Sequence, residues 1–135
     1  MWKVMLADDE KSIRTALGTL IDWQSLDCEV VYMARSGQDV LDHIGQYRPD
    51  LLITDIRMPG VDGVELANRL SGSELPIPII FLTAYTDFSY AQAAVRYSVA
   101  DYIVKPNVLE ELPQAIRRIP VSYTHLRAHE TELHL

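Results

Sequence analysis

Short apolar segments alternate along the chain with longer segments in which apolar residues recur every three or four positions. The short segments are rich in valine and isoleucine and cover residues 2–7, 28–34, 51–54, 77–83 and 102–104. This pattern indicates strands that are buried on both faces. The segments between them have the spacing of amphipathic helices. Their apolar residues are Ile13, Ala16, Leu17, Leu20 and Ile21, then Val40, Leu41, Ile44 and Tyr47, then Val64, Ala67 and Leu70, and finally Ala91, Ala94 and Val95.

Regular alternation of strand and helix predicts one parallel sheet with helices on both faces, the doubly wound α/β architecture. Ser36 and Asp39, three residues apart before an apolar stripe, indicate the start of the helix that follows the second strand. In such sheets, ligands bind beyond the carboxyl ends of the strands. Polar residues that directly follow the strands are therefore the candidates for function.

Length and charge narrow the class of protein. The chain has 135 residues, enough for one domain, and a formal charge of -7. This net negative charge argues against direct binding of the chain to the phosphate backbone of a nucleic acid, so any action on DNA would need another domain. The single cysteine, Cys28, allows no internal disulfide and fits a reducing compartment. No apolar run approaches the length of about 18 residues that spans a membrane, so we expect a cytoplasmic protein that does not bind membranes.

Acidic residues follow two of the predicted strands. Asp8 and Asp9 come directly after the first strand, and Asp55 ends the third. At a common edge of the sheet these carboxylates would converge, and their repulsion would either raise their pKa values or draw a cation among them. Oxygen ligands without histidine or cysteine favour a hard ion, and Mg²⁺ fits best.

A hydroxyl and an ammonium group are expected at the same edge. Thr83 ends the fourth strand, and Lys105 follows the fifth. Carboxylates, Mg²⁺, a lysine and a hydroxyl together form a site for a phosphoryl group, whose oxygens need positive charge and hydrogen-bond donors. Asp55 is the natural nucleophile, because carboxylates form aspartyl phosphates.

These residues also carry a resemblance to a known family. The chain resembles the receiver domain of two-component response regulators over residues 1–119. The matching segments are VMLADDE at 4–10, LITDIRMPG at 52–60, DG at 62–63, FLTA at 81–84 and DYIVKP at 101–106. The resemblance implies a flavodoxin-like, five-stranded parallel sheet in the order 2-1-3-4-5.

The resemblance also implies roles for individual residues. Asp55 would accept a phosphoryl group from a phosphohistidine of a sensor histidine kinase. Asp9, Asp55 and the backbone carbonyl of Arg57 would bind Mg²⁺ directly, and Asp8 would act mostly through water. Lys105 would pair with the phosphoryl group, and Pro106 would follow a cis peptide bond. Thr83 and Tyr102 would form the switch pair that responds to phosphorylation, and two copies would pair through the face formed by the fourth and fifth helices.

Two further segments suggest a subfamily. LIDW at 20–23 and AYTDFSYA at 84–91 resemble regulators whose receiver precedes an AraC-type DNA-binding domain. Residues 120–135 resemble no receiver and have the character of a translated sequencing adapter, so we expect them to lie outside the domain. Pro113 falls within the expected fifth helix, and we expect that helix to start near Leu112 or to bend at Pro113.

Three other interpretations compete with the receiver. A phosphohydrolase of the haloacid-dehalogenase type also uses an aspartyl nucleophile, but it needs a second acid two residues later, where this chain has Arg57. A dinucleotide-binding protein needs a glycine-rich turn after the first strand, and residues 7–11 contain no glycine. A receiver-like interaction module that no longer accepts phosphate is the alternative that stays open.

Overall fold

The structure is a computed structural model that describes residues 1–72, 77–84, 88–97 and 99–119. All strand pairs in it are parallel, and they form one sheet in the order β2-β1-β3-β4-β5. The strands are β1 (Trp2–Ala7), β2 (Cys28–Ala34), β3 (Leu51–Asp55), β4 (Ile79–Thr83) and β5 (Asp101–Val104). The predicted doubly wound α/β fold and its strand order are therefore confirmed.

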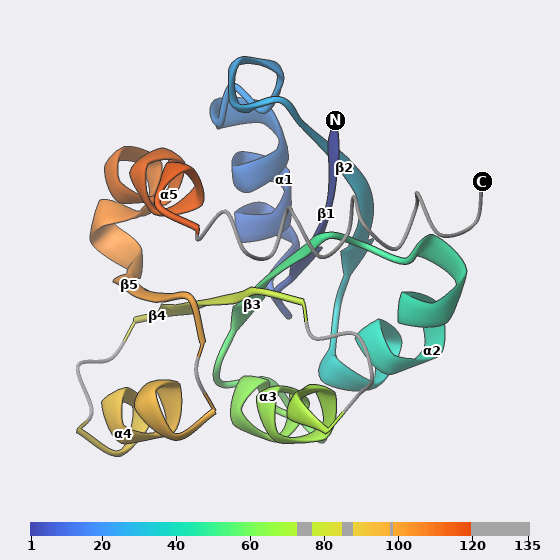
Figure 1. Cartoon of the computed structure of the whole chain (residues 1–135), viewed down its shortest axis with the longest axis vertical. Coiled ribbons are helices and arrows are strands. Elements are labelled where there is room, and N and C mark those ends of the chain that lie inside the picture. The colour runs from blue at the N-terminus through green and yellow to red at the C-terminus, as the bar shows by residue number, and fades with distance from the viewer. Residues whose placement is uncertain (73–76, 85–87, 98, 120–135) are drawn as a thin grey trace.

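Helices cover both faces of the sheet (Figure 1). They are α1 (Lys11–Leu20), α2 (Gly37–Tyr47), α3 (Gly63–Ser71), α4 (Phe88–Arg96) and α5 (Val108–Arg117), with short 3₁₀ turns at Gln24–Leu26 and Lys105–Asn107. One core cluster joins α1 and α5 to Leu6, Ile53 and Leu82, and the other joins α2, α3 and α4 to Met5 and Phe81. Successive strand residues point to opposite faces, so each strand supplies both clusters.

Every residue of β3 and β4 is buried, which explains their uninterrupted apolar sequences. β4 begins at Ile79 rather than at the predicted residue 77. Pro78 has no N–H for the ladder, although its carbonyl still accepts from the Leu52 N–H at 3.1 Å. Two residues of the predicted helix stripes, Leu20 and Val95, are 64% and 82% exposed and do not belong to the core.

The predicted start of α2 is confirmed. Ser36 is its N-cap, and the Ser36 Oγ accepts a hydrogen bond from the Asp39 N–H at 3.0 Å. The Asp39 carboxylate accepts in turn from the Arg35 N–H at 3.0 Å and from the Tyr32 hydroxyl at 2.8 Å. The first turn of α2 is therefore tied to the end of β2 by side chains as well as by backbone.

Of the two expectations for the fifth helix, the start near Leu112 is wrong, and the bend at Pro113 stays a prediction. α5 begins at Val108, and Pro113 lies inside it. Leu112, Ala115 and Ile116 are buried against the sheet, and this packing holds the helix across the proline. Proline has no N–H to donate to the carbonyl of Leu109, but Leu109 is 49% exposed, so that turn is open to water. Residues 120–135, expected to lie outside the domain, are outside the described residues.

Replacing Pro113 with alanine should raise the free energy of unfolding by about 2 kcal/mol. A proline inside a helix costs about 3 kcal/mol, and its stiffening of the unfolded chain offsets about 1 kcal/mol of that cost. Urea denaturation would measure the gain. Pro59→Ala is the control, because Pro59 is exposed in a loop and its replacement should give no gain; equal midpoints for wild type and Pro113→Ala would contradict the prediction.

None of the helices in the described ranges is both long enough and apolar enough to cross a membrane.

Candidate functional site

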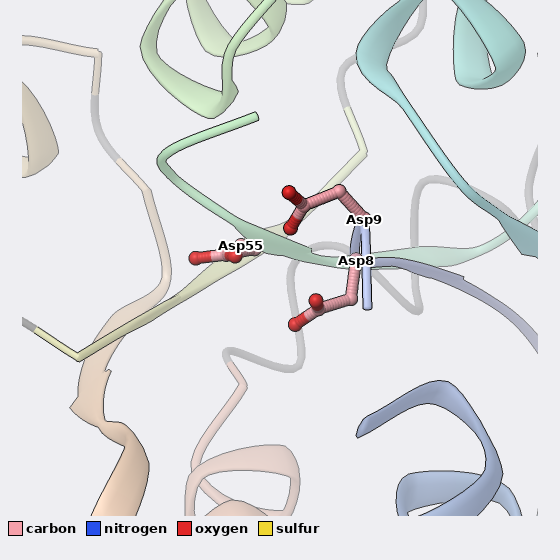
Figure 2. Close-up of side chains that lie close together, drawn as sticks. All are labelled: Asp8, Asp9 and Asp55. Atoms are coloured by element: carbon pink, nitrogen blue, oxygen red, sulfur yellow. The ribbon is translucent and has the colours of Figure 1, made fainter. Parts of the chain in front are cut away.

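Three carboxylates meet at the carboxyl edge of the sheet (Figure 2). β1 leads directly into Asp8 and Asp9, and Asp55 ends the adjacent strand β3, where Ala7 pairs with Thr54. One carboxylate oxygen from each acid lies within 4.8 Å of the others. Asp8 and Asp55 are buried, whereas Asp9 is exposed. The predicted convergence is therefore confirmed.

Lys105 brings positive charge to the two buried acids. It follows β5, and its Nζ lies 3.0 Å from Asp8 Oδ2 and 3.1 Å from Asp55 Oδ2. Burial alone would lower the pKa of Lys105, but the interactions with Asp8 and Asp55 outweigh it and raise this pKa above its ordinary value. The ammonium group therefore stays charged at neutral pH.

Asp55 has an environment that disfavours its charged form. Burial raises the pKa of the Asp55 carboxyl, and the nearby Asp8 adds to the rise, while the hydrogen bond from Lys105 opposes it. The net shift is upward. One lysine therefore does not fully offset burial and the charge of Asp8, and a second cation would be favourable here.

Asp8 keeps an acceptor directed into the cluster. Its Oδ1 accepts from the Glu10 N–H at 2.9 Å. Its Oδ2 is buried and makes no hydrogen bond, although the Lys105 ammonium lies 3.0 Å away as an ion partner. Buried carboxylate oxygens normally have hydrogen-bond or metal partners. An oxygen-only donor set with spare acceptor capacity fits Mg²⁺.

Arg14 supports the site through a contact that the sequence analysis did not predict. Its Nη1 donates to the backbone carbonyl of Asp8 at 2.7 Å, from the first turns of α1. The Asp8 N–H also donates to the Ala34 carbonyl at 3.1 Å. Together these two bonds hold in place the loop after β1, which contains Asp8 and Asp9. No sequence motif links an arginine side chain to the backbone carbonyl six positions earlier, so the sequence contains no signal for this contact.

Thr83 and Tyr102 lie on the α4 side of the sheet. Thr83 is buried and follows Leu82, which pairs with Asp55, so it ends the strand beside β3. Tyr102 pairs with Phe81, two residues before Thr83, and strand alternation places both on the α4 side. This arrangement suits the predicted switch pair, whose movement stays a prediction.

The loop between β3 and α3 contains Arg57, which is exposed. The loop closes where the Gly63 N–H donates to the Ile56 carbonyl at 2.8 Å. A Cβ at Gly63 would lie 2.6 Å from the Asp55 carbonyl oxygen, too close for any side chain. Gly63 is therefore required by space, a role that its place in the DG motif did not reveal.

The expectation of a cis peptide bond before Pro106 is wrong. The described residues contain no cis peptide bond. Pro106 lies in the first turn of the 3₁₀ helix Lys105–Asn107, where its fixed φ suits helical backbone. A trans bond also has the lower intrinsic energy for proline.

Known proteins match the chain closely. A family model described as the response regulator receiver domain matches residues 4–117. The uncharacterized transcriptional regulatory protein YesN of Bacillus subtilis is 33% identical over 119 residues, which are 88% of this chain and 32% of that protein. The transcriptional regulatory protein HptR of Staphylococcus aureus is 41% identical over 106 residues, 78% of this chain and 41% of HptR.

The fold has close solved counterparts. The REC domain of AraT, a response regulator from Geobacillus stearothermophilus, has 34% sequence identity and a TM-score of 0.80, covering 96% of this chain and 98% of that one. The chain spans less than half the length of YesN and HptR. With the family model matching residues 4–117, the chain belongs to the response regulator receiver domain family of two-component systems.

Proposed function

We propose that Asp55 is the phosphoryl acceptor of this receiver domain and that Mg²⁺ binds beside it. The observation that carries the proposal is the assembly of one oxygen each from Asp8, Asp9 and Asp55 within 4.8 Å, with Lys105 Nζ at 3.1 Å from Asp55. Receiver domains generally bind Mg²⁺, and this donor set suits that ion. Asp9, Asp55 and the Arg57 carbonyl would bind it directly, and Asp8 through water.

In this proposal, each of these residues has a role in the transfer. A carboxylate oxygen of Asp55 attacks the phosphorus of a phosphohistidine, the P–N bond breaks, and its electron pair leaves with the imidazole of the kinase. Lys105 neutralises phosphoryl oxygens, and the Thr83 hydroxyl donates a hydrogen bond to one of them. Mg²⁺, when bound, supplies further positive charge to the same oxygens. Asp55 must be ionised to react, and both cations favour that form.

The family supports a sensor kinase as the partner. Receiver domains interact with sensor histidine kinases, and we propose such a kinase as the phosphoryl donor. YesN and HptR are named as transcriptional regulatory proteins. For this chain we propose the same kind of output, through an AraC-type domain that contacts DNA, with Thr83 and Tyr102 as the switch. Pairing of two copies through α4 and α5 and a cytoplasmic location stay predictions.

Intact mass after incubation with acetyl phosphate tests the acceptor. The protein should gain one phosphoryl group in the presence of Mg²⁺ and none when EDTA removes the metal. Peptide mapping after borohydride trapping should place the modification at Asp55. A protein that folds and binds Mg²⁺ but gains no phosphoryl group would instead support the interaction-module alternative.

Magnesium should also stabilise the folded domain. A ligand that binds only the native state at about 100 times its Kd adds about 2.7 kcal/mol, which for a domain of this size is a rise in Tm of about 10 °C. Thermal unfolding with increasing MgCl₂ measures it. Asp9→Asn should remove most of the rise, whereas Glu10→Gln, the same charge change at the next exposed position outside the cluster, should keep it. Equal responses of both variants would contradict the proposed ligands.

A further inference from the structure

The first turn of α2 touches the loop between β3 and α3. Gly37, the first residue of α2, is buried, and a Cβ on it would lie 2.0 Å from the Val61 carbonyl oxygen and 2.8 Å from the Val61 carbonyl carbon. Gly37 is not among the residues with positive φ. Glycine is therefore needed here for space and not for backbone conformation, and any side chain would force one of the two segments to move.

The α2 side of this contact is firmly held. Asp39 accepts hydrogen bonds from the Arg35 N–H and the Tyr32 hydroxyl and also lies 2.9 Å from His43 Nδ1. The rings of Tyr32 and His43 stack with centroids 4.4 Å apart. Val40, in the same turn, is fully buried in the core. Shifting this turn would break several interactions at once.

The loop side has fewer restraints. Ile56 and Met58 are buried and anchor its beginning, and Val61 is only partly buried against the core, but Pro59 and Gly60 between them are exposed, and Gly60 has a φ of 76°. A side chain at position 37 would therefore displace the loop near Val61 rather than α2. The displacement would reach Arg57, because the loop is short and closed by the bond from the Gly63 N–H to the Ile56 carbonyl.

We propose that Gly37 is a positioning residue for the metal site. Because Gly37 has no side chain, α2 contacts the Val61 carbonyl directly. This contact sets the position of the loop between β3 and α3, and with it the position of the Arg57 carbonyl at the metal site. The inference rests on the proposed function, in which that carbonyl binds Mg²⁺. Mg²⁺ requires near-ideal octahedral geometry at about 2.0–2.1 Å, so small displacements of one ligand weaken binding. Groups that orient ligands typically change metal affinity by about 10–100-fold.

Gly37→Ala tests this, with Gly45→Ala as a matched control in the same helix. A Cβ at Gly45 meets nothing within 4 Å. Alanine favours helix over glycine at both positions, so Gly45→Ala should raise the unfolding midpoint and leave Mg²⁺ affinity unchanged. Gly37→Ala should weaken Mg²⁺ binding, measured by calorimetry, by about 10-fold or more, while it still unfolds cooperatively. Wild-type affinity in Gly37→Ala would overturn the proposal.

A second measurement needs no variant and applies even where Gly37→Ala fails to fold. In the NMR spectrum of the wild-type protein, MgCl₂ should shift the backbone amide signals of Arg57, Val61 and Gly37 with the same midpoint. Movement of Arg57 without Gly37 would overturn the positioning role and leave the metal site intact. Absence of any saturable Mg²⁺ binding by wild type would instead refute the proposed function, and the positioning role with it.

Discussion

Replacing Asp55 with asparagine should abolish phosphoryl acceptance and, at the same time, make the metal-free domain more stable. The amide has no carboxylate to attack phosphorus, so incubation with acetyl phosphate and Mg²⁺ should give no gain in intact mass. The substitution also removes a buried negative charge that lies beside Asp8 and is opposed by a single lysine. Single stabilising substitutions commonly add about 0.5–2 kcal/mol.

The gain in stability should depend on pH. The pKa of Asp55 is raised above its ordinary value in the folded state, mainly by burial, so the native protein holds this proton more tightly than the unfolded chain does. Wild-type stability therefore falls as pH rises from the unfolded pKa through the folded one, and the loss is complete above it. Asparagine does not titrate. The difference between Asp55→Asn and wild type should be largest at pH 7 and should shrink toward pH 4.

Urea denaturation without metal at these two pH values is the measurement. Glu10→Gln removes an exposed negative charge close by in sequence and serves as the control. It should keep phosphoryl acceptance and give no comparable gain. Phosphorylation that persists in Asp55→Asn would show that another residue is the acceptor, and a loss of stability at pH 7 would show that the acidic cluster is not strained.

Replacing Lys105 with methionine should slow phosphoryl transfer about 100-fold or more, the effect typical of removing one group that stabilises transition-state charge. Methionine keeps an unbranched side chain of similar length but has no ammonium group. Asp8 and Asp55 would then share the edge of the sheet without their ion partner, and the pKa of Asp55 should rise further. The initial rate of modification by acetyl phosphate measures the effect.

Two variants control for this result. Lys3→Met removes an exposed lysine from β1 and should leave the rate unchanged. Lys105→Arg keeps the charge but replaces a compact ammonium group with a larger, planar guanidinium group. Its rate should therefore lie between those of wild type and Lys105→Met. An unchanged rate in Lys105→Met, in a protein that still binds Mg²⁺, would remove Lys105 from the mechanism.

The candidate site shows how far sequence reasoning extends. Asp8, Asp9, Asp55 and Lys105 were predicted together because parallel strands end at one edge, and the structure assembles them there. The geometry at Pro106 and the start of α5 were predicted wrongly. Both depend on how the segment after β5 turns and packs against the core. The backbone preferences of proline alone do not specify how that segment turns and packs.

By itself, the sequence determined the order of strands and helices, the two-sided burial of β3 and β4, and the chemistry placed at each strand end. These features follow from apolar periodicity and residue type, which are properties of neighbouring residues. Only the tertiary structure decided that Arg14 holds the Asp8 carbonyl and that Gly37 and Gly63 bring backbone against backbone around the loop after Asp55. Such contacts depend on the packing distance between separate elements, and no pattern along the chain specifies that distance.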